Sequence, residues 1–458
     1  MSGRPATNRV IRGRAAISVN DPEHPLPNGW IRALLSDVAE LGTGHTPSRN
    51  HPEYWDGGVP WIGITDARTH HGGEIHTTSQ TITALGLDNS SARLLPQGTI
   101  CLSRTASVGY VVKMGRDMAT SQDFVAWTCS DALDPDYLMA ALLAEGEDIR
   151  KFGEGSTHTT IYFPAVKAFN VDVPPPAEQR RIVAKLDALT ARIARARVEL
   201  DRVPALAAKI RAAASVRLWD ASGDTTLEDF LEAPIRNGLS VKGSDQLPGI
   251  RALRLSALRG AHVNLEDVRF LPITSDRAEP FRLIAGDVLV SRGNGTLSLV
   301  GKASVVETTP VETTIFPDTA FRLRVDRKKV SERWLSLVWN SAEVRSQVEG
   351  MARTTAGIWK ISQRDLQAVR LPRVGFAEQV RIADEVQAAF GRADRLEAEA
   401  SRARALLDRL ESAILAKAFR GELVPQHPND EPASVLLERI RAARAAAPKA
   451  KRGRKAAA

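Results

Sequence analysis

A block of nine residues near the middle of the chain recurs 200 residues later with five of its residues identical. PPPAEQRRI begins at Pro174 and VGFAEQVRI begins at Val374, and the shared letters include AEQ and RI. Upstream, at an offset of about 190 residues, GVPWIGIT aligns with GIRALRLS and PQGTICLSR with IAGDVLVSR. A period of this length is the size of a domain and far exceeds that of a solenoid repeat. The order of the matching blocks therefore predicts an internal duplication.

Each copy begins with about 150 residues in which short apolar runs alternate with Gly, Pro, Asp and Asn turns. Runs such as GTICLSR and DFVAWT read as strands. A helical pattern follows in each copy, at Asp136–Phe152 and again at Glu332–Gly350. Strands followed by a helix, a loop and a further strand predict an α+β domain in each copy.

The apolar pattern changes to a helical heptad directly after each repeated block. Steps of three and four residues place the apolar side chains on one stripe, as in the seam of a coiled coil. Pro204 interrupts the first stripe and predicts a kink or break there. Packing of each helix on its own domain is the alternative, but matching stripes in both copies favour helices that pair with each other. The predicted seam residues are Ile182, Leu186, Leu189, Ile193, Leu200, Ile382, Val386, Leu396, Leu407, Leu410 and Ile414.

The composition of 43% apolar and 25% charged residues is that of an ordinary globular chain of two to four domains. No apolar run reaches the roughly 18–20 residues of a membrane helix, and the N-terminal residues lack the apolar core of a secretory signal. Cys101 and Cys129 lie in strand-like surroundings and read as buried, reduced thiols. We therefore expect a cytoplasmic protein with no membrane partner.

Motifs for catalysis and cofactor binding are missing. No Walker A sequence, dinucleotide fingerprint or amino-methyltransferase signature is found. The stretch VPPPA is not an amino-methyltransferase signature, because it lacks the polar residue before the prolines and the aromatic residue after them. His70, His71 and His76 with Glu74 form the only local histidine cluster, which reads as polar surface instead of a metal site. The sequence thus predicts no catalytic residue, no metal and no cofactor bound by this chain.

The two variable domains, each ending in P-x-x-x-EQ-x-R-I and a heptad helix, resemble the specificity subunit of type I restriction–modification systems. AKAFRGELVPQHPNDEPASVLLERIRAAR, from Ala416, is similar to that family's usual ending. The resemblance implies two target recognition domains that read the halves of a bipartite site in double-stranded DNA. It also implies helices that act as a ruler and dock two methyltransferase subunits, and through them motor/nuclease subunits where present. S-adenosylmethionine, ATP and magnesium are expected on those partners.

The predicted fold is therefore α+β, with two recognition domains in tandem, each followed by a long helix. The helices are expected to pair as an antiparallel coiled coil with pseudo-two-fold symmetry. The predicted segments are a flexible N-terminal segment at 1–25, recognition domain 1 at 26–176, a central spacer helix at 177–220, recognition domain 2 at 221–375, a C-terminal helix and docking segment at 376–440, and a basic disordered tail at 441–458.

Candidate DNA contacts fall in turns that occupy matching places in the two copies. Arg and Asn can read guanine and adenine edges, and small hydroxyl side chains suit phosphate contacts. Arg104 and Arg292 are the strongest candidates, because a shared Ser-Arg follows a strand in both copies. A solvated turn or a strand-end cap is the alternative for each position. The candidates are Thr46, Ser48, Arg49, Arg104, Ser107, Ser156, Thr157, His158, Arg236, Asn237, Ser240, Lys242, Arg292, Asn294, Thr296, Arg353, Thr354, Thr355 and Lys360.

Charge is distributed unevenly along the chain. The net charge of +8 depends largely on 441–458, which contain seven Lys or Arg residues and no acid. Residues 26–176 have a net charge of −7, whereas 224–375 have a net charge of +4. The tail is expected to add only non-specific phosphate affinity. Two other functions remain open: a non-catalytic DNA-binding scaffold or regulator outside restriction, and a methylase or nuclease in its own right.

Overall fold

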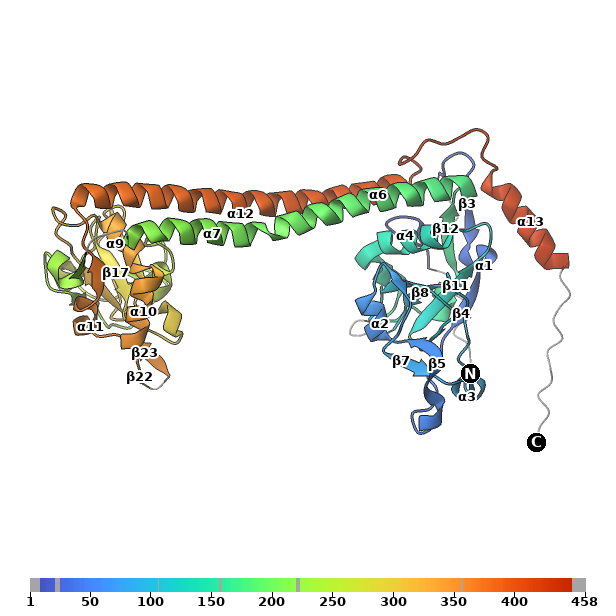
Figure 1. Cartoon of the computed structure of the whole chain (residues 1–458), viewed down its shortest axis with the longest axis horizontal. Helices are drawn as coiled ribbons and strands as arrows, with labels where there is room; N and C mark the ends of the chain where they lie inside the picture. Colours follow the sequence, from blue (N-terminus) through green and yellow to red (C-terminus); the bar gives the residue numbers. More distant parts are fainter. Residues whose placement is uncertain are drawn as a thin grey trace. The chain divides into compact units, whose positions relative to one another are not determined.

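The computed structural model describes residues 9–20, 25–105, 107–155, 159–219, 223–355 and 357–446, without the side chains of Thr355 and Arg444. The chain divides into two compact units (Figure 1). The first unit comprises Met1–Val198 with Ala403–Ala458, and the second comprises Glu199–Arg402. Among the described residues, no helix is long and apolar enough to cross a membrane.

The first unit contains three small sheets with the strand orders β1-β2-β12-β3, β4-β11-β8-β9-β6 and β10-β5-β7. Neighbouring strands are antiparallel except in the pairs β6–β9 and β10–β5. The strands are β1 (Ile11–Arg12), β2 (Ile17–Val19), β3 (Ile31–Leu34), β4 (Ala39–Thr43), β5 (Trp55–Ile62), β6 (Glu74–Ile75), β7 (Gln80–Ile82), β8 (Ile100–Ser103), β9 (Val111–Met114), β10 (Ala119–Thr120), β11 (Phe124–Cys129) and β12 (Phe169–Val173).

Helix α4 (Pro135–Glu145) is the main helix of this recognition domain. Asp134 caps its N-terminus by accepting from the amides of Asp136 and Tyr137, and Pro135 occupies the first turn. Tyr137 and Trp127 are fully buried in the core of the unit. The shorter helices are α1 (Leu35–Val38), η1 (Pro52–Tyr54), α2 (Ile64–Thr69), α3 (Ala84–Asp88), η2 (Gly146–Phe152) and α5 (Phe163–Lys167).

The N-terminal residues are part of the first domain, and the predicted flexible segment at 1–25 is wrong in its described part. Strand β2 pairs with β12 and is fully buried. The carboxylate of Glu145 accepts from the backbone amides of Arg14, Ala15 and Ile17. Burial raises the pKa of Glu145, while these three amides act in the opposite direction. A buried acceptor from α4 therefore orders a segment that composition alone marks as polar and flexible.

The second unit contains sheets with the orders β14-β21-β17-β19, β16-β15-β20, β18-β23-β22 and β13-β24. All neighbours are antiparallel except β15 and β20. The strands are β13 (Asp224–Thr226), β14 (Arg236–Asn237), β15 (Ile250–Leu253), β16 (Val268–Leu271), β17 (Val288–Ser291), β18 (Gly293–Asn294), β19 (Ala303–Val305), β20 (Thr314–Ile315), β21 (Ala320–Leu323), β22 (Arg353–Thr355), β23 (Ile358–Lys360) and β24 (Arg370–Pro372).

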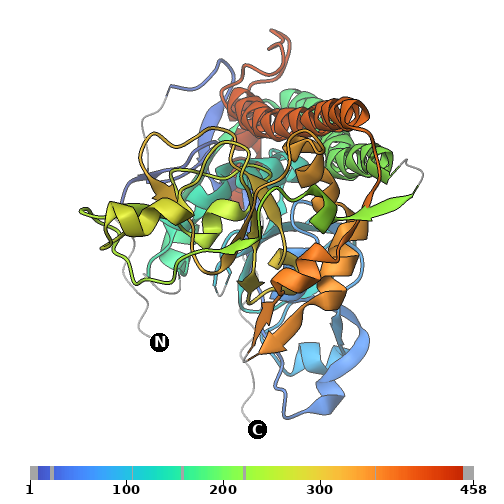
Figure 2. The ribbon, with the colours of Figure 1, turned by 90° about the vertical axis from the view of Figure 1, so that its left-hand side faces the viewer.

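Helices α9 (Glu332–Trp339) and α10 (Ala342–Met351) take the place of α4 in this unit. Ser331 caps α9, and Trp334 and Trp339 are completely buried in the core. The hairpin of β22 and β23 lies at the end of the unit away from the long helices (Figures 1 and 2). The remaining helices are η3 (Arg217–Trp219), η4 (Leu227–Phe230), η5 (Leu255–Leu258), α8 (Ser275–Ala278), η6 (Glu279–Phe281), η7 (Leu297–Leu299) and α11 (Gln363–Gln367).

A long helix follows each recognition domain, as the heptad pattern predicts. The first is divided into α6 (Pro176–Asp201) and α7 (Val203–Val216), and the second is the single helix α12 (Phe376–Ala418). The division falls at Arg202, and Pro204 lies in the first turn of α7, where its missing amide leaves no helical bond unmade. The break predicted from Pro204 is confirmed.

Within each unit, α12 runs antiparallel to the other long helix. In the first unit Arg197 of α6 contacts Asp408 and Glu411 of α12, each at 2.7 Å. In the second unit Arg211 of α7 contacts Asp394 at 2.6 Å and Glu397 at 2.7 Å. A residue nearer the start of the first helix therefore pairs with one nearer the end of α12. The predicted α+β domains with antiparallel partner helices are confirmed.

Fewer side chains are buried between the long helices than the heptad pattern predicts. Leu396 and Leu410 are 41% and 49% exposed, so their predicted burial is wrong. Ion pairs flank the seam where a second apolar row would lie, and alanines fill much of the buried row. The buried seam residues are Ile182, Leu186, Ile193, Ile382, Val386 and Ile414, together with Ala207, Ala389, Ala393 and Ala400, whereas Leu189, Leu200 and Leu407 are partly buried.

The repeated Gln explains much of the duplicated motif. The Gln179 side chain accepts from the amide of Asp134 at 2.7 Å and donates to the carbonyls of Ala132 and Pro174, each at 2.8 Å. This fully buried amide therefore fastens the start of α6 to the start of α4.

Gln379 makes the same three bonds in the second unit. It accepts from the amide of Ser331 at 2.9 Å and donates to the carbonyls of Lys329 and Val374 at 3.2 and 2.8 Å. The Gln of AEQ is thus a structural residue that joins each long helix to its recognition domain. Because it is buried, it cannot form part of a surface for partners.

Replacing Gln179 by alanine should destabilise the attachment of α4, and Gln379→Ala should do the same for α9. Each change leaves buried backbone groups without partners, which costs about 2–3 kcal/mol. Hydrogen exchange should report the loss in the unit that carries the substitution. Gln363→Ala, which removes only an exposed bond to Asn237, is the control. Equal exchange in the control and in Gln179→Ala would contradict the structural role of the motif.

The segment after α12 packs on the first unit. Phe419 and Leu437 join its core, and Arg181 of α6 contacts Asp430 at 2.6 Å. Helix α13 (Ala433–Ala446) continues six residues past the predicted start of the tail at 441, so that boundary is wrong. The apolar side of α13, with Ala433 and Leu437, packs on the first domain. Arg441, past the predicted boundary, contacts Asp37 at 2.6 Å. The predicted disorder beyond Ala446 lies outside the described residues.

Candidate nucleic-acid interface

The shared Ser-Arg occupies the same backbone position in both recognition domains. Arg104, directly after β8, donates its amide to the carbonyl of Asp123 at 2.7 Å and accepts from the amide of Ile161 at 2.9 Å. Arg292, directly after β17, donates to the carbonyl of Thr319 at 2.7 Å and accepts from Ile361 at 3.0 Å. The two arginines therefore begin from equivalent positions in the duplicated fold.

Each guanidinium group donates a hydrogen bond to a backbone carbonyl of a neighbouring loop. Nη2 of Arg104 donates to the carbonyl of Gln122 at 3.0 Å, and its guanidinium lies 4.6 Å from the centre of the Phe163 ring. Burial lowers the pKa of Arg104, an effect that the nearby Asp123 opposes. Nη1 of Arg292 donates to the carbonyl of Asp318 at 3.3 Å. Each arginine thus holds a loop in place and keeps further donors for a ligand.

The candidates between β4 and β5 are arranged around tryptophan rings. Arg49 lies 3.6 Å from the centre of the Trp55 ring and donates to the side chain of Gln80 at 2.9 Å. Ser48 is exposed and accepts from the amide of Asn50, while Thr46 is hydrogen-bonded to Gln122. Stacking holds Arg49 in one orientation and leaves much of its charge exposed. None of these three candidates lines the first unit's cavity, which contains Ser107.

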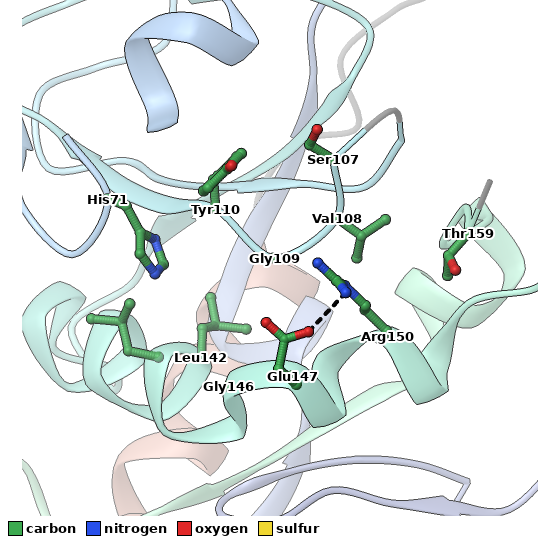
Figure 3. A pocket seen from close by; sticks show the side chains of 11 residues that line it. His71, Ser107, Val108, Gly109, Tyr110, Leu142, Gly146, Glu147, Arg150 and Thr159 are labelled. Carbon is green, nitrogen blue, oxygen red and sulfur yellow. Dashed lines mark ion pairs between the residues drawn. The ribbon is translucent and has the colours of Figure 1, made fainter. Parts of the chain in front are cut away.

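Ser107 lines a cavity of about 570 Å³ in the first unit (Figure 3). Arg150 and Glu147, from η2, form an ion pair of 2.8 Å on its opposite wall. His71 closes another side, where its Nδ1 accepts from the amide of Val111 and its ring packs edge-on against Tyr110. The cavity combines one cation with one carboxylate and offers no excess positive charge. Ser156, Thr157 and His158, also predicted as DNA contacts, lie outside the described residues.

Four candidates of the second domain meet in one cleft of about 630 Å³. The cleft brings together residues from β14, the end of β17, the β22–β23 hairpin and α11. Of these, Arg364 and Gln363 are missed by the sequence reasoning, because the matching residues of the first copy are Pro164 and Phe163 and give no repeated polar signal. The lining residues are Asn237, Arg292, Phe321, Arg353, Lys360, Ile361, Ser362, Gln363, Arg364 and Asp365.

The other candidates of the second domain are not lining residues of this cleft. Arg236 donates to the carbonyl of Pro280 at 3.1 Å, and Asn294 accepts from the amide of Thr296 at 3.1 Å. Ser240 and Lys242 are exposed. Thr354 is exposed on β22, and the side chain of Thr355 is not described.

The described residues contain no group of three or more His, Cys, Asp or Glu side chains placed to hold a metal ion. In the histidine cluster, His76 contacts Glu74 at 3.2 Å on the surface. Burial raises the pKa of the Cys101 thiol, and burial raises that of Cys129 to about 12. Both thiols are unpaired, and a raised pKa makes them poor nucleophiles near neutral pH.

The chain is similar in sequence to proteins of one family. Residues 27–201 match the model of the type I restriction modification DNA specificity domain. The chain is 27% identical to the type I restriction enzyme EcoKI specificity subunit of Escherichia coli K12, over 94% of this chain and 98% of that protein. Over nearly its whole length, the chain is similar to type I restriction–modification specificity subunits. The chain is also 25% identical to the StySPI specificity subunit of Salmonella potsdam, over 94% of this chain and 99% of that protein.

Two solved structures have a similar fold. The HsdS subunit from Thermoanaerobacter tengcongensis aligns with a TM-score of 0.62 and 20% identity, over 88% of this chain and 99% of that chain. A chain from a type I R-M system, solved for its complex assembly and conformational transition, aligns with a TM-score of 0.64 over 88% of this chain and all of the other. The matched domain is described as a DNA specificity domain, and the relatives that span most of this chain are named specificity subunits.

Proposed function

We propose that this specificity subunit reads a bipartite, asymmetric DNA target, with one recognition domain on each half-site. The observation that carries the proposal is the equivalent placement of Arg104 and Arg292, surrounded by different side chains in the two domains. Equivalent frames present donors to DNA in a similar way, while different neighbours select different bases. Two unlike readers in one chain make the half-sites unlike, so the target need not be a palindrome.

The long helices are proposed to dock two methyltransferase subunits. Large apolar side chains on them remain 41–68% exposed although their neighbours are charged. Exposed apolar side chains grouped on one element are typical of an interaction surface. These side chains occur on α6, α7 and both halves of α12, in keeping with more than one docking position. They are Val198, Leu206, Val216, Leu396, Leu406 and Leu410.

The chemistry is proposed to belong to the partners. S-adenosylmethionine would bind the methyltransferase subunits, and ATP and magnesium would serve motor/nuclease subunits that join through them where present. Double-stranded DNA is the ligand of this chain, and no membrane takes part. The family relatives support this division, because the curated proteins that cover most of this chain are named specificity subunits.

Co-purification with the methyltransferase subunit tests the proposal. Light scattering should give two methyltransferase subunits for each chain, and the complex should bind DNA more tightly than the chain alone. The isolated chain should also aggregate more readily, because the docking surface then remains exposed to water. A stable one-to-one complex at saturating partner would contradict docking on both copies. Target binding without any adenine methylation in cells would instead support a regulator outside restriction.

A further inference from the structure

The cleft of the second domain has an excess of positive charge. Arg292, Arg353, Lys360 and Arg364 line it, and none of the four forms an ion pair with another described residue. Asp365 also lines it, but its carboxylate accepts from the amide and hydroxyl of Ser362, 3.1 and 2.6 Å away. Cations without carboxylate partners, gathered in one concave surface, favour an anionic ligand.

The backbone of the β22–β23 hairpin fixes two of these cations. Arg353 and Lys360 are opposite each other across the antiparallel pair, so both side chains emerge from one end of the hairpin. Gly293 of β18 pairs with Lys360, and a side chain at Gly293 would come within 3.2 Å of the Lys360 Cγ. The glycine therefore permits the lysine stem to lie against the strand that follows Arg292.

The matching positions of the first domain have the opposite charge balance. An antiparallel bridge joins Glu154 and Thr160, where the second domain has Arg353 and Lys360. Helix α5 corresponds to α11 at an offset of 200 residues, and Pro164 stands where α11 has Arg364.

The residue whose carbonyl accepts the hydrogen bond from the arginine amide of the Ser-Arg turn also differs between the domains. It is Asp123 beside Arg104 and Thr319 beside Arg292. At the preceding position the second domain has the additional carboxylate, because Asp318 stands where the first domain has Gln122. The second domain thus places four cations and two carboxylates where the first places one cation and two carboxylates.

We propose that the cleft of the second domain binds backbone phosphates of the DNA and that the described residues of the first domain form no equivalent phosphate site. This inference rests on the proposed function, because it assumes that both domains contact the duplex. The second domain then supplies most of the salt-dependent affinity, and the first contributes mainly through base contacts. Phosphate binding by Lys and Arg is independent of sequence and releases counterions, so it has a measurable salt signature.

The test compares the wild-type complex of chain and methyltransferase with the double variant Arg353→Ala, Lys360→Ala. Binding is measured on a duplex with the methylated motif and on a duplex of equal length with both half-sites scrambled, between about 50 and 200 mM salt. The slope of log affinity against log salt should fall by about two in magnitude. Affinity should drop by the same factor on both duplexes, roughly tenfold or more at physiological salt.

Two control pairs separate the cleft from general surface charge. Lys328→Ala with Lys329→Ala removes two exposed cations of the same unit outside the cleft. Glu154→Ala with Thr160→Ala changes the matching bridge of the first domain. In both control pairs, the slope of log affinity against log salt should be no smaller in magnitude than in the wild type. In the wild-type complex, ethylation of phosphates should interfere with binding more strongly at the half-site of the second domain.

An unchanged slope in the Arg353, Lys360 variant would overturn the inference. A loss confined to the motif duplex would also overturn it, since the two side chains would then read bases. Failure of the wild-type complex to distinguish the two duplexes would instead sink the proposed function. The salt slopes would still report phosphate contacts in that case, so the two failures are distinguishable.

Discussion

A seven-residue insertion in both paired helices should lengthen the spacer of the methylated motif by about three base pairs and leave both half-sites intact. Seven helical residues add about 10 Å, and one base pair advances about 3.4 Å along the duplex. Repeating Ile193–Glu199 in α6 and Asp408–Ile414 in α12 keeps the heptad pattern and the pairing of Arg197 with Glu411. Sequencing of methylated adenines measures the spacer directly.

The same insertion rotates one half-site by about 100° around the duplex, at roughly 10–10.5 base pairs per turn. We therefore expect a lower methylation rate together with the longer spacer. Repeating the heptad in α6 alone is the control, because it leaves seven residues of α6 without a partner on α12. That single insertion should abolish methylation or preserve the original spacer by looping out. An unchanged spacer in the double insertion, with full activity, would contradict the ruler.

Replacing Arg104 by alanine should relax one half-site, and Arg292→Ala should relax the other. Loss of a bidentate arginine contact to a guanine costs about 1–3 kcal/mol of discrimination at that base. The structure adds a second consequence: each arginine also holds a loop carbonyl, of Gln122 or of Asp318. The loops should therefore exchange amide hydrogens faster in the variants.

Arg116→Ala and Arg277→Ala are matched controls, since both side chains are exposed in their domains. These controls should methylate the wild-type motif. Relaxation of both half-sites by one arginine substitution would contradict the proposal that each domain reads one half-site. Faster exchange in the loop without any change in the motif would show that the arginine is only a loop anchor.

The sequence predicts the large architecture because that depends on repeated, periodic signals. The AEQ motif, the heptads and Pro204 mark the duplication, the long helices and their break, all of which the structure contains. The sequence is less informative where a position depends on one distant partner. Strand β2 is ordered by Glu145, and Leu396 is exposed because ion pairs occupy the flank of the seam. Neither partner is marked by periodicity.

The cleft of the second domain is predictable only in part. Arg292 and Lys360 follow from the matching Ser-Arg turn and the adjacent hairpin, but they are far apart in sequence and their meeting depends on the pairing of β18 with β23. Arg364 has no signal at all, because the first copy has Pro164 there. A duplication reveals what two domains share, whereas specificity resides in the positions where they differ.

The central claim is that one chain reads two unlike half-sites. Its most direct test is sequencing of methylated adenines in cells that express this chain with its methyltransferase subunit and, separately, the Arg104→Ala and Arg292→Ala chains. We expect a motif of two different half-sites separated by an unspecified spacer of fixed length, with each substitution relaxing a different half. A single uninterrupted motif, or two identical half-sites, would contradict it.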